Sequence, residues 1–226
     1  MGEEHASAER DANVSRIEDS HSALVRLRKE CVARFGNGLG LPIIPSRPAF
    51  LRNLYKGGHV LDVGAGAGQP LKAELGLNSE CYSSLDVDPL GHFTYHTWDE
   101  VPPDARYALV TANQVLEHLD LRDASQLIQR AAGHLELQGI FVCTTPNMLH
   151  PTRYWGDPTH RSTWNYADLY ALCASAGLSV KHIVRYSRQQ PKGFVNRFLA
   201  RRISTLFNID WCDSILLVAA KQEHLM

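Results

Sequence analysis

From His59 onward, short apolar runs alternate with segments in which apolar residues recur every three or four positions. A short apolar run bounded by glycine, proline or polar residues is typical of a buried strand, and the longer spacing is typical of an amphipathic helix. Strands are predicted over 59–63, 81–85, 107–112, 139–144, 178–185 and 213–220, with a further candidate at 93–98. Helices are predicted over 68–76, 117–135 and 165–176.

This alternation predicts an α/β fold, a doubly wound and largely parallel sheet with helices on both faces. In such sheets a ligand binds outside the carboxyl ends of the strands, near the switch in strand order. The segments that follow the predicted strands are therefore the expected lining of a site, namely 62–68, 86–88, 97–99, 113–118 and 144–160.

The pattern outside the alternating region predicts the domain organisation. Residues 1–13 lack periodicity and are expected to be disordered, whereas 14–226 is expected to form one domain. Within that domain, 14–50 is predicted to be a helical lid and linker, and 188–212 a helical insertion before the last strand. Apolar residues at helical spacing and several basic residues share the stretch 192–207, which fits either a core-facing helix or a surface that contacts a membrane.

Composition excludes several protein classes. The chain has 226 residues, 44% hydrophobic and 21% charged, with a net charge of -1, so no overall attraction to nucleic acid is expected. The five cysteines form no C-x-x-C pair, which favours reduced thiols in the cytoplasm over disulfides or a zinc finger. The polar beginning of the chain does not resemble a secretory signal, and SILLVAA is too short to cross a membrane.

The stretch VLDVGAGAGQP, residues 60–70, predicts a tight turn between a strand and a helix. Its glycines allow a ligand to approach the backbone closely, although a purely structural turn is an alternative. A dinucleotide loop reads G-x-G-x-x-G, but Gln69 stands at the third glycine position and Gly68 comes one residue early. Asp62 favours a ligand with a cationic amine over a pyrophosphate, which points to S-adenosylmethionine rather than NAD.

A second acidic residue, Asp86, follows the next predicted strand about twenty residues beyond the loop. A carboxylate at this spacing is expected to accept hydrogen bonds from the two hydroxyls of a ribose. Val87 is then expected to face the adenine, while Asp88 and Pro89 fit the start of a helix.

Four motifs together resemble the class I S-adenosylmethionine-dependent methyltransferases over residues 50–185: VLDVGAGAG, LDVDP, YALVTANQVLEHL and FVCTTPN. VLEHL and TPN are similar to the branch of ubiquinone-pathway and polysaccharide-pathway O-methyltransferases. The resemblance implies a Rossmann-like, seven-stranded, mostly parallel sheet with an antiparallel last strand. It also implies a contact to the adenine after the third strand, where Thr97, Trp98 and Asp99 are candidates. The expected S-adenosylmethionine-binding residues are Asp62, Gly64, Ala65, Gly66, Gly68, Asp86, Val87, Trp98, Asn113 and Gln114.

The candidate catalytic residues are Glu117, His118 and His160. If a helix includes 114–118, then Gln114, Glu117 and His118 share one of its faces and offer acid–base groups or ligands for a divalent metal. The small-RNA 2′-O-methyltransferases show a similar layout, which holds magnesium or manganese. The present chain matches it at Glu117, His118 and His160 and departs from it at Gln114.

The leading functional hypothesis is an S-adenosylmethionine-dependent O-methyltransferase that acts on a small molecule or a glycan. The first alternative is a metal-dependent RNA ribose 2′-O-methyltransferase, against which the neutral charge and the absence of a recognisable RNA-binding module count. An NAD-dependent oxidoreductase is a further alternative, against which Gln69 and the VLEHL and TPN motifs count. A non-catalytic binding protein that keeps the fold is the last alternative, and the intact Asp62, Gly64, Gly66 and Asp86 argue only against a loss of cofactor binding.

Overall fold

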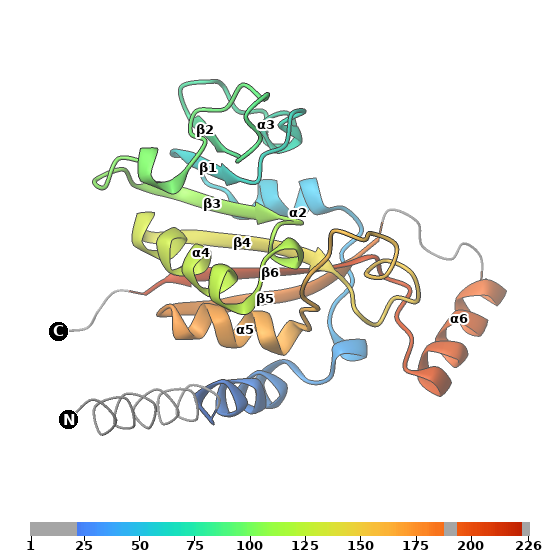
Figure 1. Cartoon of the computed structure of the whole chain (residues 1–226). Helices are drawn as coiled ribbons and strands as arrows, with labels where there is room; N and C mark the ends of the chain where they lie inside the picture. The colour runs from blue at the N-terminus through green and yellow to red at the C-terminus, as the bar shows by residue number, and fades with distance from the viewer. Residues whose placement is uncertain (1–21, 188–193, 223–226) are drawn as a thin grey trace, which may run out of the picture.

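The computed structural model describes residues 22–187 and 194–222, in which six strands form one sheet (Figure 1). The strand order is β2-β1-β3-β4-β6-β5. The first four strands of that order are parallel, and β6 is antiparallel to both of its neighbours. The strands are β1 (Val60–Val63), β2 (Tyr82–Leu85), β3 (Tyr107–Asn113), β4 (Leu135–Pro146), β5 (Leu178–Tyr186) and β6 (Ser214–Lys221). The predicted α/β, Rossmann-like architecture with an antiparallel last strand is thus confirmed.

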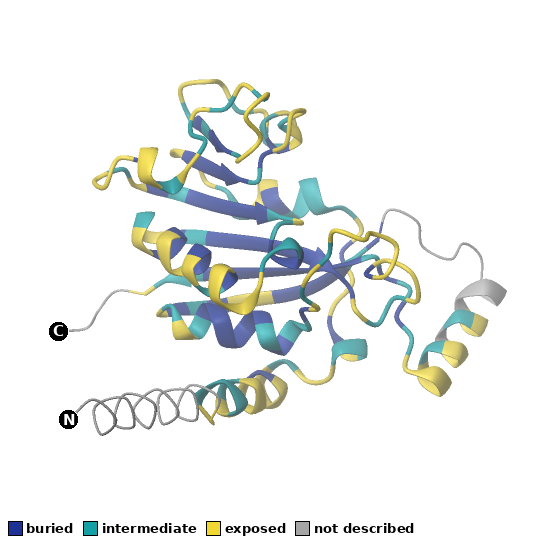
Figure 2. Ribbon diagram, viewed as in Figure 1, coloured by how far each residue is buried: buried dark blue, intermediate teal, exposed yellow. Residues whose placement is uncertain are grey.

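Helices cover both faces of this sheet, so its strands are buried on both sides (Figure 2). One apolar core joins Leu61 and Val63 to α4 (Leu121–His134) and α5 (Tyr166–Ser175). The other joins Val60 and Leu109 to α2 (Arg47–Leu54) and α3 (Pro70–Leu75). This two-sided burial explains why the strands read as continuous apolar runs. The helices are α2 (Arg47–Leu54), α3 (Pro70–Leu75), α4 (Leu121–His134), α5 (Tyr166–Ser175) and α6 (Phe194–Phe207), with 3-10 turns η1 (Gly38–Gly40), η2 (Trp98–Glu100) and η3 (Leu116–His118).

The prediction of a seventh strand is wrong for the described residues. The segment 93–98 forms only one isolated bridge, between Tyr95 and Leu85, and is not a strand of the sheet. Side chains replace ladder hydrogen bonds on the N-terminal side of that bridge. The backbone N–H of Ser84 donates to the Thr94 hydroxyl, and the Thr94 N–H donates to the Ser84 hydroxyl, both at 3.1 Å. Such local hydrogen bonds compete with a regular ladder, and here they keep the strand from extending.

The helix predicted over 117–135 begins later, at Leu121. Asp120 is its N-cap, and the Asp120 carboxylate accepts a hydrogen bond from the N–H of Asp123 at 2.9 Å. The preceding residues form η3 instead, so Gln114, Glu117 and His118 do not share one α-helical face. The prediction that these three residues share a helical face is therefore wrong. The α-helix begins after Asp120 because an aspartate is a stronger N-cap than the apolar residues before it.

The N-terminal region differs in part from the predicted lid and linker. Residues 22–35 are helical and lie along α5, where the Tyr170 hydroxyl donates to Glu30 at 2.5 Å. The predicted linker contains α2, which Ser46 caps and which has a proline in its first turn. The predicted disordered segment 1–13 lies outside the described residues, as do 188–193 of the predicted insertion.

Candidate functional site

The loop between β1 and α3 contains two glycines in the left-handed region. Gly64 has a φ of +68° and Gly66 a φ of +62°. A Cβ on Gly64 would also lie 2.3 Å from Cγ2 of Val115, whereas a Cβ on Gly68 would meet nothing within 4 Å. The backbone conformation and the close approach of the loop to Val115 both require glycine at position 64.

Gly64→Ala is expected to lower the free energy of unfolding by roughly 2 to 4 kcal/mol, because a strained φ and a side-chain clash add. Gly68→Ala is the matched control and should change that free energy by less than about 0.5 kcal/mol. Urea denaturation followed by circular dichroism measures both. Equal effects of the two substitutions would contradict this assignment of the loop glycines.

Asp86 follows β2 and is held in place by two backbone N–H groups. One carboxylate oxygen accepts a hydrogen bond from Gly66 at 2.8 Å, and the other accepts one from Asp88 at 3.1 Å. The carboxylate therefore joins the end of β2 to the glycine loop. Each carboxylate oxygen has further lone pairs, so Asp86 remains able to accept hydrogen bonds from a ligand.

A cavity of about 630 Å³ opens at the carboxyl ends of β1, β2 and β3, and we call it the strand-end cavity. This volume lies within the range of cofactor and ligand pockets. The predicted cofactor residues that line it are Gly64, Asp86, Val87, Trp98 and Gln114, and His118 lines it as well. Ala65, Gly66, Gly68 and Asn113 do not belong to its lining.

Asp62 also lies outside the lining of the strand-end cavity. Its side chain is buried, and its two carboxylate oxygens accept hydrogen bonds from the hydroxyls of Thr111, at 2.6 Å, and Tyr82, at 2.9 Å. Burial raises the pKa of Asp62, while the two hydroxyls oppose that rise. Because Tyr82 lies on β2 and Thr111 on β3, Asp62 joins β1 to both neighbouring strands below the glycine loop.

Glu117 is a buried carboxyl group without a hydrogen-bond partner. The residue is 1% exposed, and neither carboxylate oxygen has a partner among the described residues. Burial raises the pKa of Glu117 to about 8, and the charge of Asp157 adds to the rise. Unpartnered buried carboxylates are rare in proteins and are associated with binding or catalysis. Its backbone carbonyl accepts hydrogen bonds from Arg161 and Ser162, so Glu117 also anchors the loop that carries His160.

Hydrogen bonds at Nδ1 determine which nitrogen of each nearby histidine is available. Nδ1 of His160 lies 2.7 Å from the carbonyl oxygen of Tyr154, which can only accept, so this nitrogen carries the proton. Nδ1 of His118 lies 3.0 Å from the hydroxyl of Thr159, which itself donates to Asp157 at 2.6 Å. In their neutral forms both histidines therefore present an unprotonated Nε2.

The three predicted catalytic residues come together in space. Glu117, His118 and His160 each offer one ligand atom, and these atoms all lie within 4.8 Å of one another. We call this set the Glu-His-His cluster. His118 also lines the strand-end cavity, so the cluster adjoins it. Gln114 instead donates from its side chain to the Thr144 hydroxyl at 3.1 Å and is not part of the cluster.

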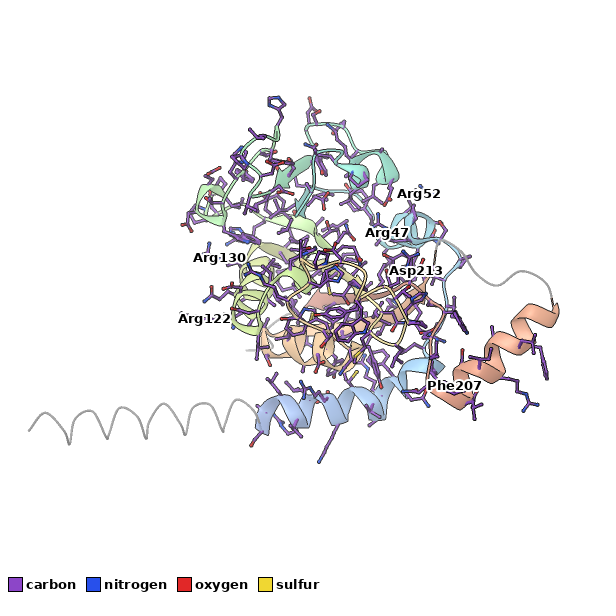
Figure 3. All side chains as sticks on the ribbon, turned by 45° about the vertical axis from the view of Figure 1, so that its right-hand side comes forward. Arg47, Arg52, Arg122, Arg130, Phe207 and Asp213 are labelled. Atoms are coloured by element: carbon purple, nitrogen blue, oxygen red, sulfur yellow. The ribbon has the colours of Figure 1, made fainter. Side chains whose placement is uncertain are left out.

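The sequence interpretation missed residues of α4 that line the cavity. Asp123, Gln126 and Arg130 recur at helical spacing on that face, and this spacing was a usable signal. Arg130 projects from α4, and its guanidinium donates to the Asp99 carboxylate at 3.0 Å (Figure 3). Thr159 was also missed. No periodic pattern in the sequence indicates it, because its hydroxyl contacts His118 across a loop that takes this position only in the folded chain.

Comparisons with known proteins agree on the fold. The model of a family described as a methyltransferase domain matches residues 42–183. The chain is similar to the crystal structure of a SAM-dependent methyltransferase from Archaeoglobus fulgidus, with 21% identity, a TM-score of 0.59, and coverage of 77% of this chain and 92% of that chain.

It is also similar to the N-methyltransferase NodS from Bradyrhizobium japonicum in complex with S-adenosyl-L-homocysteine, with 17% identity, a TM-score of 0.53, and coverage of 78% and 86%. A search of curated proteins found no significant match. The family model covers more than half of the chain, and the glycine loop and Asp86 lie within the matched residues. The chain therefore belongs to the methyltransferase domain family, and it is an enzyme, a methyltransferase built on the fold of the S-adenosylmethionine-dependent methyltransferases.

Proposed function

We propose that this methyltransferase transfers a methyl group from S-adenosylmethionine to a hydroxyl oxygen of a small molecule or a glycan. The observation that carries this proposal is the buried, unpartnered Glu117 carboxyl beside two histidines at the edge of the strand-end cavity. A hydroxyl acceptor has to lose its proton for transfer, and these groups are able to receive that proton or to hold a metal.

The strand-end cavity is proposed to hold the methyl donor. Asp86 would accept hydrogen bonds from the ribose hydroxyls, while Val87 and Trp98 would contact the adenine. The loop with Gly64 would lie close to the rest of the donor because no side chain intervenes there. Asp62 would act indirectly, since its hydrogen bonds to Thr111 and Tyr82 support the strands below the loop. Bound S-adenosylmethionine supplies the electrophilic methyl group.

The Glu-His-His cluster fits a divalent metal ion such as magnesium or manganese. Its carboxylate suits either ion, and its two imidazole nitrogens suit manganese better than magnesium. The two histidines already donate their other N–H to oxygen acceptors. The lack of a partner for the Glu117 carboxylate within the described part of the chain is also explained by a bound cation. A bound divalent ion supplies Lewis-acid chemistry, which lowers the pKa of a hydroxyl group.

Without a metal, His118 would act as the general base. Its Nε2 is unprotonated in the neutral form, and His118 lines the cavity. The Thr159 hydroxyl would accept from Nδ1–H and pass the interaction on to Asp157, which orients the ring. Hydrogen bonds from Thr159 lower the pKa of Asp157, so Asp157 stays negative and stabilises a protonated His118.

A transfer assay with methyl-labelled S-adenosylmethionine tests the proposal. Candidate acceptors are monosaccharides, phenols and nucleotide-linked sugars, and the expected product is a methyl ether. Pretreatment with a chelator is expected to reduce turnover by about a hundredfold or more if a metal holds the acceptor, and manganese should restore it. Unchanged turnover after chelation would remove the metal and leave His118 as the base.

The RNA ribose 2′-O-methyltransferase remains a second candidate because the Glu-His-His cluster resembles the metal site of such enzymes. The same assay distinguishes it by including an RNA oligonucleotide and its 2′-deoxy equivalent. Methylation of the RNA alone would favour this candidate over a small-molecule or glycan acceptor.

A further inference from the structure

Five large apolar side chains lie exposed on α6: Phe198, Leu199, Ile203, Leu206 and Phe207. We call them the α6 apolar set. Their exposed fractions run from 39% for Ile203 to 76% for Leu206. Single exposed apolar residues are common on protein surfaces, but five on one helix of fourteen residues indicate a surface that contacts another body.

The position of α6 agrees with such a contact. The helix stands apart from the sheet and from the helices that cover it (Figures 1 and 2). Hydrogen bonds connect it to the segment that follows it, since Trp211 donates to the carbonyl of Ala200 and Ile209 to that of Ser204, both at 3.2 Å. These contacts hold the end of α6 and leave the α6 apolar set uncovered by the rest of the described chain.

The charge of α6 indicates the chemistry of that body. The helix sequence FVNRFLARRISTLF contains three arginines and no acidic residue. The guanidinium of Arg202 lies over the ring of Phe198, 5.2 Å from its centre. An arginine placed in this way covers apolar surface with its stem and is long enough to extend its charge toward a polar layer. A negatively charged surface with an apolar layer beneath it complements this arrangement.

We propose that α6 docks the enzyme in the plane of an anionic lipid bilayer, with the α6 apolar set inserted among the lipids and the Arg202 guanidinium at the headgroups. A helix of fourteen residues is about 21 Å long, too short to cross a bilayer, and no described helix meets the length and apolarity required for crossing. A second copy of the chain is a poorer occupant, because two α6 helices would bring arginines of like charge together. This proposal does not depend on the identity of the methyl acceptor.

Sedimentation of the full chain with vesicles tests the docking. Vesicles of phosphatidylcholine with phosphatidylglycerol should carry the protein down, whereas vesicles of phosphatidylcholine alone should carry down at least about tenfold less. Leu206→Ser should weaken binding to the anionic vesicles about tenfold, because a large apolar side chain no longer enters the lipid. Arg202→Gln should weaken it about fivefold at low salt.

Leu137→Ser is the matched control, since Leu137 is also a largely exposed leucine but lies on β4. It should bind vesicles as the unchanged chain does, and thermal melting should show that both leucine variants are folded. The proposal would be overturned by no binding to anionic vesicles, by equal binding of Leu206→Ser, or by a dimer in sedimentation velocity that Leu206→Ser dissociates.

Discussion

Glu117→Ala is expected to reduce methyl transfer by about a thousandfold, because it removes the buried carboxyl of the Glu-His-His cluster. The affinity for S-adenosylmethionine should stay within about threefold, since Glu117 does not line the strand-end cavity. Single-turnover assays measure the first quantity and calorimetry the second. A loss of donor affinity that equals the loss of turnover would contradict the proposed role.

Glu136→Ala provides the control for removing a glutamate, because Glu136 lies near the amino end of β4, away from the strand ends that carry the site. Its turnover should match that of the unchanged enzyme. Glu117→Gln adds a finer comparison, since it keeps the shape of the side chain and removes the charge. We expect Glu117→Gln to lose turnover as well, because an amide does not accept a proton and is a weak metal ligand.

The unchanged enzyme and Glu117→Gln should differ in how their free energies of unfolding depend on pH. In the folded metal-free chain the pKa of Glu117 is raised from 4.5 to about 8. Below about pH 4.5 the carboxyl is therefore protonated in both the folded and the unfolded state. As the pH rises between these values, the unfolded chain loses the proton first, and the folded state becomes less stable. The stability that the folded state gains from a neutral Glu117 is fully present below about pH 4.5 and is lost as the pH rises through about 8.

Relative to Glu117→Gln, the unchanged chain should therefore lose roughly 1.4 kcal/mol of unfolding free energy per pH unit across this range, on the order of 5 kcal/mol in total. Urea denaturation in the presence of a chelator at several pH values measures the difference. Parallel pH curves for the two proteins would show that Glu117 does not have a raised pKa.

Asp86→Ala is expected to weaken S-adenosylmethionine binding by about a hundredfold to a thousandfold. Two hydrogen bonds from ribose hydroxyls to a charged acceptor are lost, and about 1.5 to 2 kcal/mol for each accounts for this factor. The Gly66 N–H also loses its acceptor, so the glycine loop becomes less well ordered. Isothermal titration calorimetry with S-adenosylmethionine and with its demethylated product measures the effect.

Asp88→Ala is the control for Asp86→Ala, because the Asp88 carboxylate accepts from Leu90 in the turn and does not line the strand-end cavity. Its affinity for S-adenosylmethionine should stay within about threefold of that of the unchanged chain. NAD and NADP should produce no heat with any of these proteins. Tight NAD binding in place of S-adenosylmethionine would overturn the assignment of the cavity.

Local pattern predicted the parallel strands, α5 and the glycine loop well, because each follows from the spacing of neighbouring residues. It failed where competing local interactions decide. The segment 93–98 has the composition of a strand, yet hydrogen bonds between Ser84 and Thr94 stop its ladder. In the same way the spacing of apolar residues did not show that Asp120 would cap α4 and leave Glu117 in a 3-10 turn.

By itself the sequence determined the order of strands and helices, the glycines of the first loop, and the candidates Glu117, His118 and His160. Those features depend on hydrophobic period and on residue type, which are local properties. Only the tertiary structure decided that Asp62 lies beneath the loop, that Thr159 orients His118, and that Glu117 is buried with no partner among the residues described. Burial and hydrogen-bond partners arise from segments far apart in the chain, because desolvation depends on what packs around a group rather than on its neighbours in sequence.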